Sequence, residues 1–427
     1  MAKETDTALR SQVLYCVYVR SHTREGTFQA LRRDLERIKS LGTDVIWLMP
    51  IHPVGEQRKK GSLGCPYAVR DYRAVNPAYG AMEDFRALVE EIHRLGMRCI
   101  IDIVYNHTAP DSWLAQNHPE WFHHDTGGAP VNRVADWSDV VDLDYSSRAL
   151  WDYQIETLKQ WAAIVDGFRC DAASMVPLEF WREARAACAQ VKEGLLWLAE
   201  SVYADFVRQL RAMGMPCWSD GELYQVFDVA YDYDIWPWYE KYLRGEISLP
   251  VYIEVLRLQD GLYPENYVKL RCLENHDRPR IAGQVTDRGR LEQLTAFQMF
   301  QRGMALLYAG QEWANVHTPS LFEKETVDRE TGTDLSPLLR RLAEIKKDEI
   351  TVRGSWELRE EGGAVYARYR LGDRLLCGVF RLEGDGGRIA VELPDGKYPE
   401  LLYGGIVEVS SGAVASGERP LIFEGTL

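Results

Sequence analysis

Carboxylates, histidines and an arginine follow several short apolar runs of this chain, each at the point where the run ends. These ends read DIVYNH (102–107), GFRCD (167–171), LWLAES (196–201) and ENHD (274–277). A carboxylate can serve as nucleophile, general acid or general base, and a neighbouring cation or imidazole can hold its charge or bind hydroxyl groups. The chain shows no GxGxxG or Walker-type loop and no serine-centred nucleophile elbow. The pattern favours acid–base chemistry at an oxocarbenium-like centre, with Asp171, Glu200 and Asp277 as candidate catalytic residues.

The elements that carry these ends alternate between strand-like and helical patterns. Apolar residues recur at spacings of three and four in Thr27–Leu41 and again in 83–95, which predicts helices with one buried face. Eight apolar runs are predicted as strands: Leu14–Val19, Val45–Leu48, Cys99–Val104, Gly167–Cys170, Leu195–Ala199, Cys217–Leu223, Val268–Leu273 and Ala305–Tyr308. Eight strands with helical crossovers predict an α/β fold, a (β/α)8 TIM barrel, whose active site lies at the carboxyl ends of the strands.

Two segments depart from the alternation. Residues 107–143 have little helical period and are predicted to form a short inserted loop subdomain after the third strand. After a predicted helix at 335–349, the chain changes to alternating segments punctuated by turns, such as AVYARYRLG. We therefore predict a catalytic barrel over 1–350 that includes 107–143, and a small all-β domain, a β-sandwich, over 351–427.

Composition narrows the possible partners and the compartment. The 427 residues carry a net charge of −14, which disfavours nucleic acid and anionic membrane surfaces as partners. No run approaches the roughly 20 apolar residues of a membrane span, and the first ten residues lack the apolar stretch of a signal peptide. The eight cysteines form no CxxC pair and are predicted to be reduced and mostly buried, as in a cytoplasmic protein.

Taken together, the four strand-end motifs resemble those of the α-amylase superfamily, glycoside hydrolase family 13, in order and in spacing. The resemblance extends to DLDY (142–145), PYAVRDY (66–72), NPAYG (76–80) and GQE (310–312), and it covers roughly residues 10–345. One tetrapeptide would be weak evidence, whereas four in order on predicted strand ends are specific. The small β domain stands where such enzymes carry their C-terminal domain.

The resemblance implies a role for each residue of the motifs. Asp171 would be the nucleophile, Glu200 the general acid and then base, and Asp277 the residue that binds sugar hydroxyls of the distorted ring. Retention of configuration places the first two carboxyl groups roughly 5–5.5 Å apart. Arg169, two residues before Asp171 on one strand, would keep it ionised. The residues expected to bind the same sugar are His107, His276 and Tyr67, the last by stacking.

Metal binding and aromatic stacking are the less specific implications. In the family, an Asn at the position of Asn106 and an Asp at that of Asp142 commonly bind calcium. Here the insertion is short, and Ser174 and Met175 replace a Lys-His pair, so no cofactor is expected to be essential, and calcium at Asn106 and Asp142 stays an open alternative. His118, His123 and His124 match no common zinc spacing. One or two of the aromatic residues in 235–239 and Trp113, Trp121 and Trp137 are expected to touch substrate.

The sequence thus predicts a cytoplasmic, retaining α-glycoside hydrolase of the α-amylase type, acting on α-1,4-linked glucans or malto-oligosaccharides. A 4-α-glucanotransferase or an exo-acting α-glucosidase would use the same motifs, because the acceptor sites decide between them. The short insertion favours an open cleft and endo action. The alternative from another class is an inactive carbohydrate-binding protein, although all three acids remain.

Overall fold

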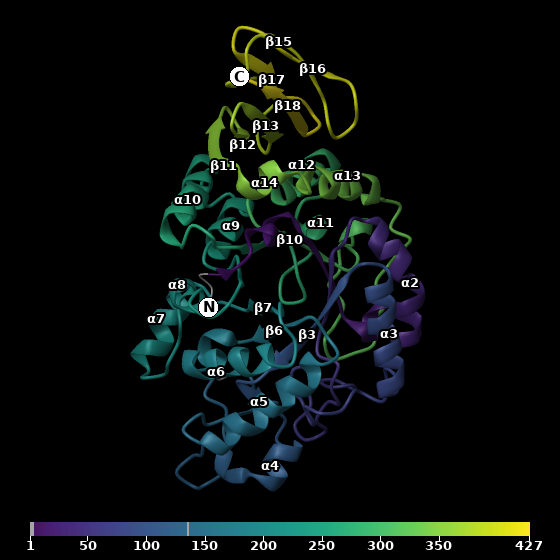
Figure 1. Cartoon of the computed structure of the whole chain (residues 1–427), viewed down its shortest axis with the longest axis vertical. Coiled ribbons are helices and arrows are strands. Elements are labelled where there is room, and N and C mark those ends of the chain that lie inside the picture. Colours follow the sequence, from purple (N-terminus) through teal and green to yellow (C-terminus); the bar gives the residue numbers. More distant parts are fainter. Residues whose placement is uncertain (1–3, 135) are drawn as a thin grey trace.

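A computed structural model describes residues 4–134 and 136–427 of the chain. Eight parallel strands close into a barrel, and helices pack around its outside (Figure 1). The predicted (β/α)8 TIM barrel is confirmed. Around the barrel the order is β1 (Val13–Val17), β10 (Met304–Tyr308), β9 (Lys269–Arg271), β8 (Val229–Tyr231), β7 (Leu196–Ala199), β6 (Gly167–Asp171), β3 (Arg98–Val104) and β2 (Val45–Leu48).

The surrounding helices form where the sequence has one apolar face. In α2 (Phe28–Ser40) the side chains of Leu31, Leu35 and Ile38 are buried, and the Thr27 side chain caps the amino end by accepting from the backbone N–H of Ala30. The larger remaining helices are α3 (Met82–Arg94), α5 (Arg148–Ala162), α6 (Leu178–Ala189), α7 (Ala204–Ala212), α9 (Trp236–Leu243), α10 (Leu249–Leu262), α12 (Arg288–Phe300) and α13 (Ser336–Lys346). The short ones are α1 (Val19–His22), α4 (Trp113–Asn117), α8 (Asp220–Leu223), α11 (Ile281–Gln284) and α14 (Glu349–Arg353).

One predicted strand is wrong. The run Cys217–Leu223 contains α8, and the barrel strand of this part of the chain is β8, later in the sequence. The reason is local: Ser219 and Glu222 form a capping box, which starts a helical turn at Asp220. The true strand has only three residues, Val229–Tyr231, between aspartates, so its apolar signal is short.

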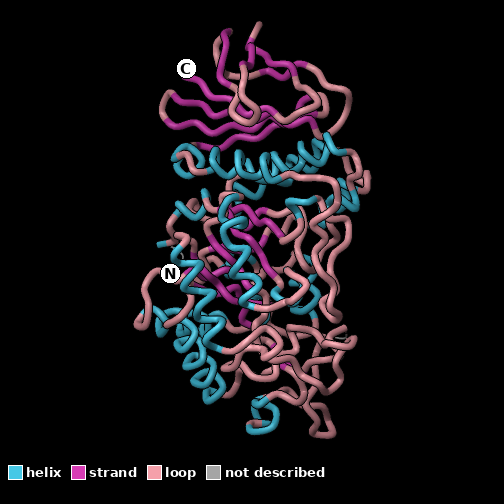
Figure 2. Tube along the Cα trace, turned by 90° about the vertical axis from the view of Figure 1, so that its right-hand side faces the viewer, coloured by secondary structure: helices cyan, strands magenta, loops and turns pink. Residues whose placement is uncertain are grey.

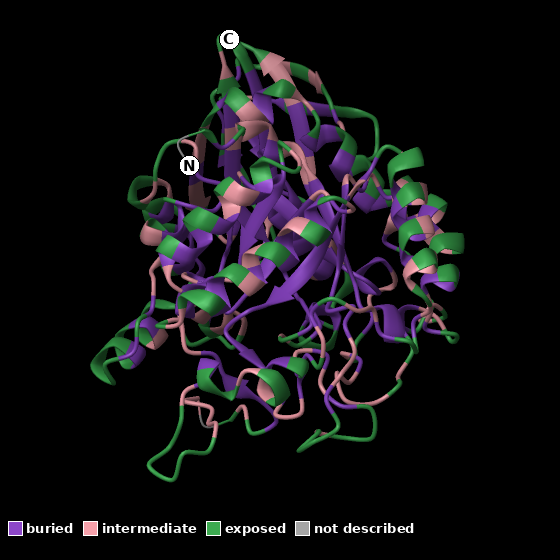
Figure 3. Ribbon diagram, turned by 60° about the horizontal axis from the view of Figure 1, so that its bottom comes forward, coloured by how far each residue is buried: buried purple, intermediate pink, exposed green. Residues whose placement is uncertain are grey.

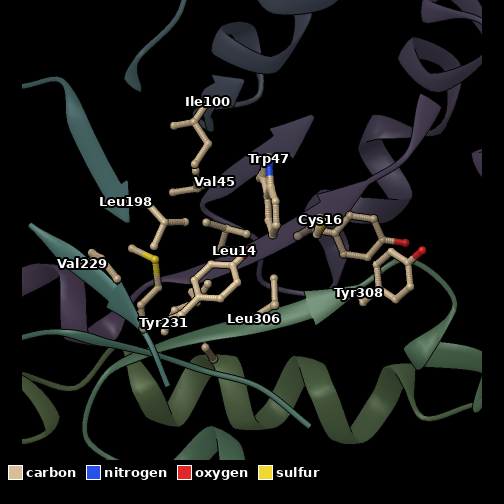
Figure 4. Close-up of a cluster of buried hydrophobic side chains, with 14 of the residues drawn as sticks. Leu14, Cys16, Val45, Trp47, Ile100, Leu198, Val229, Tyr231, Leu306 and Tyr308 are labelled. Atoms are coloured by element: carbon tan, nitrogen blue, oxygen red, sulfur yellow. The ribbon is translucent and has the colours of Figure 1, made fainter. Parts of the chain in front are cut away.

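The barrel interior is filled by side chains from most of its strands. Leu14, Trp47, Leu198, Tyr231 and Leu306 point toward one another in Figure 4, and all five are at most 1% exposed. Figure 3 shows the strands buried and the outer helices exposed on the face away from the barrel. The barrel is therefore a packed core, and a site is expected at the carboxyl ends of its strands.

The segment between β3 and α5 contains the predicted insertion. It holds a small antiparallel pair, β4 (His107–Thr108) with β5 (Val141–Asp142), together with α4. His107 pairs with Asp142 in this ladder. The insertion lies at the end of the molecule opposite the C-terminal strands (Figure 1).

The C-terminal strands form one four-stranded antiparallel sheet and two smaller pairs. The sheet has the order β11 (Ser355–Glu361), β12 (Ala364–Leu371), β13 (Arg374–Arg381) and β18 (Leu421–Thr426). The pairs are β14 (Arg388–Ala390) with β17 (Ala413–Ala415), and β15 (Gly396–Pro399) with β16 (Ile406–Val409). A row of helices separates this sheet from the barrel (Figure 2). The predicted small all-β region is confirmed as a fold, with its first strand beginning at Ser355.

All eight cysteines lie in the described part of the chain, where each is a free thiol, and six of them are buried. In the described residues no helix combines the length and the apolar character needed to cross a membrane.

Candidate active site

The predicted catalytic residues meet at one cavity over the carboxyl ends of the barrel strands. Asp171 is the last residue of β6, Glu200 follows β7 directly, and Asp277 lies in the loop after β9. All three line a cavity of about 380 Å³. Tyr67 and His107 line it as well, so residues predicted from separate motifs share one site.

Arg169 is the centre of the charge arrangement. Its fully buried guanidinium donates through Nη1 to Asp171 Oδ1 at 2.7 Å and to Asp102 Oδ1 at 2.9 Å. Its Nη2 forms an ion pair with Glu200 Oε1 at 2.8 Å. One planar cation therefore joins the two predicted catalytic carboxylates.

The strand register explains this arrangement. β3 and β6 pair so that Asp102 lies opposite Arg169 and Val104 lies opposite Asp171. Arg169 and Asp171, two residues apart, point to the same face of β6. Residue spacing along β6 thus sets the distance between cation and carboxylate.

Burial raises the pKa of both predicted catalytic carboxyls. For Asp171, burial outweighs the attraction of Arg169 and the pKa rises to about 6. For Glu200, burial together with the charges of Asp171 and Asp277 raises the pKa to about 7, although Arg169 opposes it. The expectation that Arg169 holds Asp171 ionised therefore applies only above about pH 6. A proton held by Glu200 near neutral pH is what a general acid needs.

The pKa of Asp277 is shifted in the opposite direction, below its ordinary value. Burial would raise its pKa, but the adjacent His276 and the cations Arg169 and Arg278 bring it down to about 2. His276 Nε2 lies 3.1 Å from Asp277 Oδ2, and the same contact raises the pKa of His276. Asp277 therefore stays an acceptor-only carboxylate at the cavity, suited to bind hydroxyl groups.

The predicted sugar-binding residues support each other. The Tyr67 hydroxyl lies 2.7 Å from His276 Nε2 and donates to Asp102 Oδ2 at 3.1 Å, and the two rings stack. His107 Nε2 lies 3.9 Å from Asp171 Oδ2, and burial lowers the pKa of His107. The Nδ1 atom of His107 is 3.2 Å from the Asn106 side-chain nitrogen.

Asp102 is a site residue that the sequence analysis did not single out. It is fully buried and accepts from Arg169, from Tyr67 and from the indole N–H of Trp47 at 3.3 Å. The sequence does contain an indication of its role: Asp102 is a charged residue in the middle of an otherwise apolar strand, at the start of the DIVYNH motif. A buried carboxylate of this kind must have charged or hydrogen-bonded partners.

The residues implied for calcium do not fit the ion. Asp142 is wholly buried, and its Oδ2 accepts from the Arg133 Nε at 3.1 Å and from the Arg133 backbone N–H at 3.0 Å. A guanidinium therefore lies at Asp142 Oδ2, where a hard cation would need an oxygen ligand, and the buried Oδ1 alone has no partner among the described residues. No cluster of three or more His, Cys, Asp or Glu suited to a metal occurs in residues 4–134 and 136–427. Arg133 supplies the positive charge at this point of the insertion.

Of the aromatic candidates, Trp137 lines the cavity and its ring lies 5.0 Å from that of His107. Trp121 is buried against His118, and Trp113 stacks on Tyr153, so both pack the insertion. Among 235–239, Trp236 and Tyr239 are buried in the core.

Comparisons with known proteins identify the family of this chain. The family profile described as "Alpha amylase, catalytic domain" matches residues 6–138 and 133–369, and "Bacterial Alpha amylase C-terminal domain" matches 357–423. The chain belongs to the α-amylase family.

Among solved structures, an α-amylase from Lactobacillus plantarum is 43% identical, with a TM-score of 0.97 over 99% of this chain and 100% of that one. The maltogenic α-amylase AmyB from Thermotoga neapolitana is 34% identical, with a TM-score of 0.89 over 98% and 100%. An intracellular maltogenic amylase of Bacillus subtilis is 26% identical over 77% of this chain and 56% of its own length. The chain spans about half the length of the curated relatives it matches.

Proposed function

We propose that this protein is a cytoplasmic, retaining α-glycoside hydrolase of the α-amylase type that cleaves α-1,4-glucosidic bonds in glucans or malto-oligosaccharides. The observation that carries the proposal is the buried Arg169 guanidinium that joins Asp171 to Glu200 inside one cavity. The name of the Bacillus subtilis relative, an intracellular maltogenic amylase, supports both the substrate class and the compartment.

In the first step Asp171 attacks the anomeric carbon of the bound sugar. Arg169 Nη1 holds Asp171 Oδ1, so the free oxygen for attack is Oδ2. Glu200 gives its proton to the glycosidic oxygen as the bond to the leaving sugar breaks, which leaves a β-glycosyl ester on Asp171. The pKa of about 7 lets Glu200 carry that proton at neutral pH.

In the second step a water attacks the same carbon from the other face and releases Asp171. Glu200, now ionised, takes the proton of that water, so the product keeps the α configuration. The backbone N–H of Ala172 donates to Glu200 Oε2 at 2.7 Å and fixes the carboxyl group in both steps. Asp277 and His107 bind hydroxyls of the sugar that stays on the enzyme.

A transferase is the second candidate, and the leaving-group side of the cavity favours it. Beside Glu200 the lining is apolar, with Met175, Val202 and Phe206. Such a surface packs against the apolar face of an acceptor sugar and offers water few hydrogen bonds. The products then decide, because a 4-α-glucanotransferase makes chains longer than its substrate.

The test is a time course on maltoheptaose, with chain lengths by chromatography and anomeric configuration by proton NMR. A hydrolase gives α-configured products no longer than the substrate, and an exo-acting α-glucosidase gives glucose first. The Asp171→Asn and Glu200→Gln variants are expected to lose about 10²- to 10⁴-fold in kcat/KM, whereas Asp385→Asn, at an exposed site in the C-terminal region, serves as the unchanged control. Wild-type protein that binds glucans and cleaves none would instead indicate the inactive carbohydrate-binding protein.

A further inference from the structure

One rim of the cavity is formed by the loop 56–64, which precedes Tyr67. Hydrogen bonds hold this loop to two neighbouring segments, one on each side. On one side it bonds to the segment 318–325, where the Leu63 N–H donates to the Phe322 carbonyl at 3.0 Å and the Ser62 N–H donates to Glu323 at 2.8 Å. The buried guanidinium of Arg20 donates to the carbonyls of Leu63, Gly64 and Leu321 at 3.0–3.1 Å. The loop is therefore fixed to the wall that follows β10.

On its other side the same loop reaches the insertion through Lys60. The Lys60 ammonium donates to the Asp136 carbonyl at 2.8 Å and forms an ion pair with Asp139 Oδ1 at 3.0 Å. Lys60 and Asp139 both line the cavity, and so does Trp137, two residues before Asp139. The rim thus runs without a break from the segment after β10 to the insertion.

The position of the rim relative to Glu200 tells which end of the substrate it meets. The general acid stands on the side of the leaving sugar, where Val202, Tyr203 and Phe206 line the cavity. Lys60 and Asp139 lie instead near Tyr67 and His107, the residues predicted to hold the retained sugar. Cys65 and Ala68, on either side of Tyr67, pack with Val140, the residue after Asp139. The Trp137 ring contacts His107 and also reaches Val202 and Phe206, so it lies between the two ends of the cavity. The rim therefore crosses the cavity beyond the retained sugar.

We propose that Lys60, paired with Asp139, is a specificity-determining residue that closes the retained-sugar end and binds the non-reducing end of a short glycone. This rests on the proposed glycosidase function. The consequence is release of short malto-oligosaccharides from chain ends, which differs from the open cleft that the short insertion favours.

The two side chains have the hydrogen-bonding capacity for this role. An ammonium has three donors, and the structure describes partners for two of those on Lys60. Asp139 is buried, and its Oδ2 has no hydrogen-bond partner among the described residues. A donor beside an acceptor matches a pair of neighbouring sugar hydroxyls, and a neutral sugar can meet both without introducing a charge.

The experiment compares maltoheptaose with maltoheptaose whose non-reducing end is blocked by a 4,6-O-ethylidene group. Wild-type protein is expected to cleave the free substrate to short products and to leave the blocked one nearly intact. Lys60→Met should raise KM for maltotriose by about tenfold to a hundredfold, because a charged hydrogen bond is lost, while kcat changes little. It should also cut the blocked substrate faster and give longer products.

Lys59→Met is the matched control, since Lys59 lies in the same loop, pairs with the exposed Glu56 and is not among the residues lining the cavity. Asp139→Asn should shift the products in the same direction as Lys60→Met. Equal wild-type rates on free and blocked substrate, or a Lys60→Met product pattern identical to that of wild type, would overturn this inference alone. A wild type that cleaves no glucan would overturn the proposed function as well.

Discussion

At the scale of single residues, the two raised carboxyl pKa values set the pH range of activity. Asp171 must be ionised, which requires a pH above about 6, and Glu200 must be protonated, which requires a pH below about 7. The expected kcat/KM profile is therefore a narrow bell with its optimum between these values. A pH series on a maltotriose-derived chromogenic substrate measures it, and a flat profile from pH 5 to pH 9 would contradict the assignment.

An Asp102 variant tests whether the acidic limb of the pH profile comes from the ionisation of Asp171. The negative charge of Asp102 is one cause of the raised pKa of Asp171. Replacing Asp102 by the neutral, isosteric Asn removes the repulsion, so the acidic limb should move to lower pH while the basic limb moves less. The maximal rate should also fall, since Arg169 and Tyr67 lose a charged acceptor. An acidic limb that stays in place would assign it to a group other than Asp171.

At the scale of elements, the insertion is held by the ion pair between Arg133, in a loop, and Asp142 of β5. Asp142 is wholly buried, so removing its cation leaves an unpaired charge inside the protein. Because Arg133 is a quarter exposed, we expect Arg133→Met to lower the free energy of unfolding by about 1–3 kcal/mol. The Asp142→Asn, Arg133→Met double variant should recover part of the lost free energy of unfolding, since the amide that replaces the Asp142 carboxylate would carry no charge.

Calcium should have no effect on the wild-type protein for the same reason. Thermal unfolding scans with excess calcium and with a chelator are expected to give the same Tm, because Arg133 already neutralises Asp142. A Tm that rises with calcium concentration would show that the ion binds the native state. The Arg133→Met variant is the informative comparison, because it removes the guanidinium from Asp142 Oδ2.

The end of α13 carries a buried lysine whose titration affects stability. Lys346 donates to the carbonyls of Met299 and Gln301, and burial lowers its pKa to about 7. The unfolded chain keeps a pKa near the ordinary 10.5, so between these values it binds more protons than the folded protein does. The free energy of unfolding should therefore rise with pH from about 7 to 10.5, by at most about 1.4 kcal/mol per pH unit.

Lys346→Met tests this directly, since methionine has nearly the same length and no charge. Urea unfolding at a series of pH values should show the rise for the wild type and lose this component in the variant. If the two proteins have parallel stability profiles above pH 7, Lys346 is charged in the native state.

The comparison of sequence with structure also belongs to this scale. Strands such as Val45–Leu48 could be predicted because local apolar runs stop at polar ends, and the four motifs brought Asp171, Glu200 and Asp277 to one site. The strand β8 could not be predicted in this way, because a run of three apolar residues is too short to show a strand pattern. Lys60 and Asp139 could not be predicted for another reason: they meet only when the loop 56–64 packs on the insertion, and they lie 79 positions apart in the sequence, so no local pattern joins them.

At the scale of the whole molecule, the barrel and the C-terminal sheet share one core. The hydrophobic cluster that fills the barrel continues through Leu358, Val365 and Phe380 of the sheet. Phe300, at the end of α12, is the main link, because its ring packs against Trp356, Tyr369 and Phe380 at 5.4–6.1 Å. The Tyr369 hydroxyl also donates to the Phe300 carbonyl at 2.8 Å. A boundary between two domains near 350 therefore does not predict two independent unfolding units.

Calorimetry of the full chain is expected to show a single transition for this reason. Phe300→Ala removes a 5% exposed ring that contacts both regions, so it should lower the free energy of unfolding by about 3–5 kcal/mol and keep one transition at a lower Tm. Ile406→Ala, at a 69% exposed side chain of β16, should cost less than about 0.5 kcal/mol. Two resolved transitions in the wild type would mean that the shared core does not couple the regions. In that case the sheet would unfold without loss of the active site, because every residue that lines the cavity precedes α13.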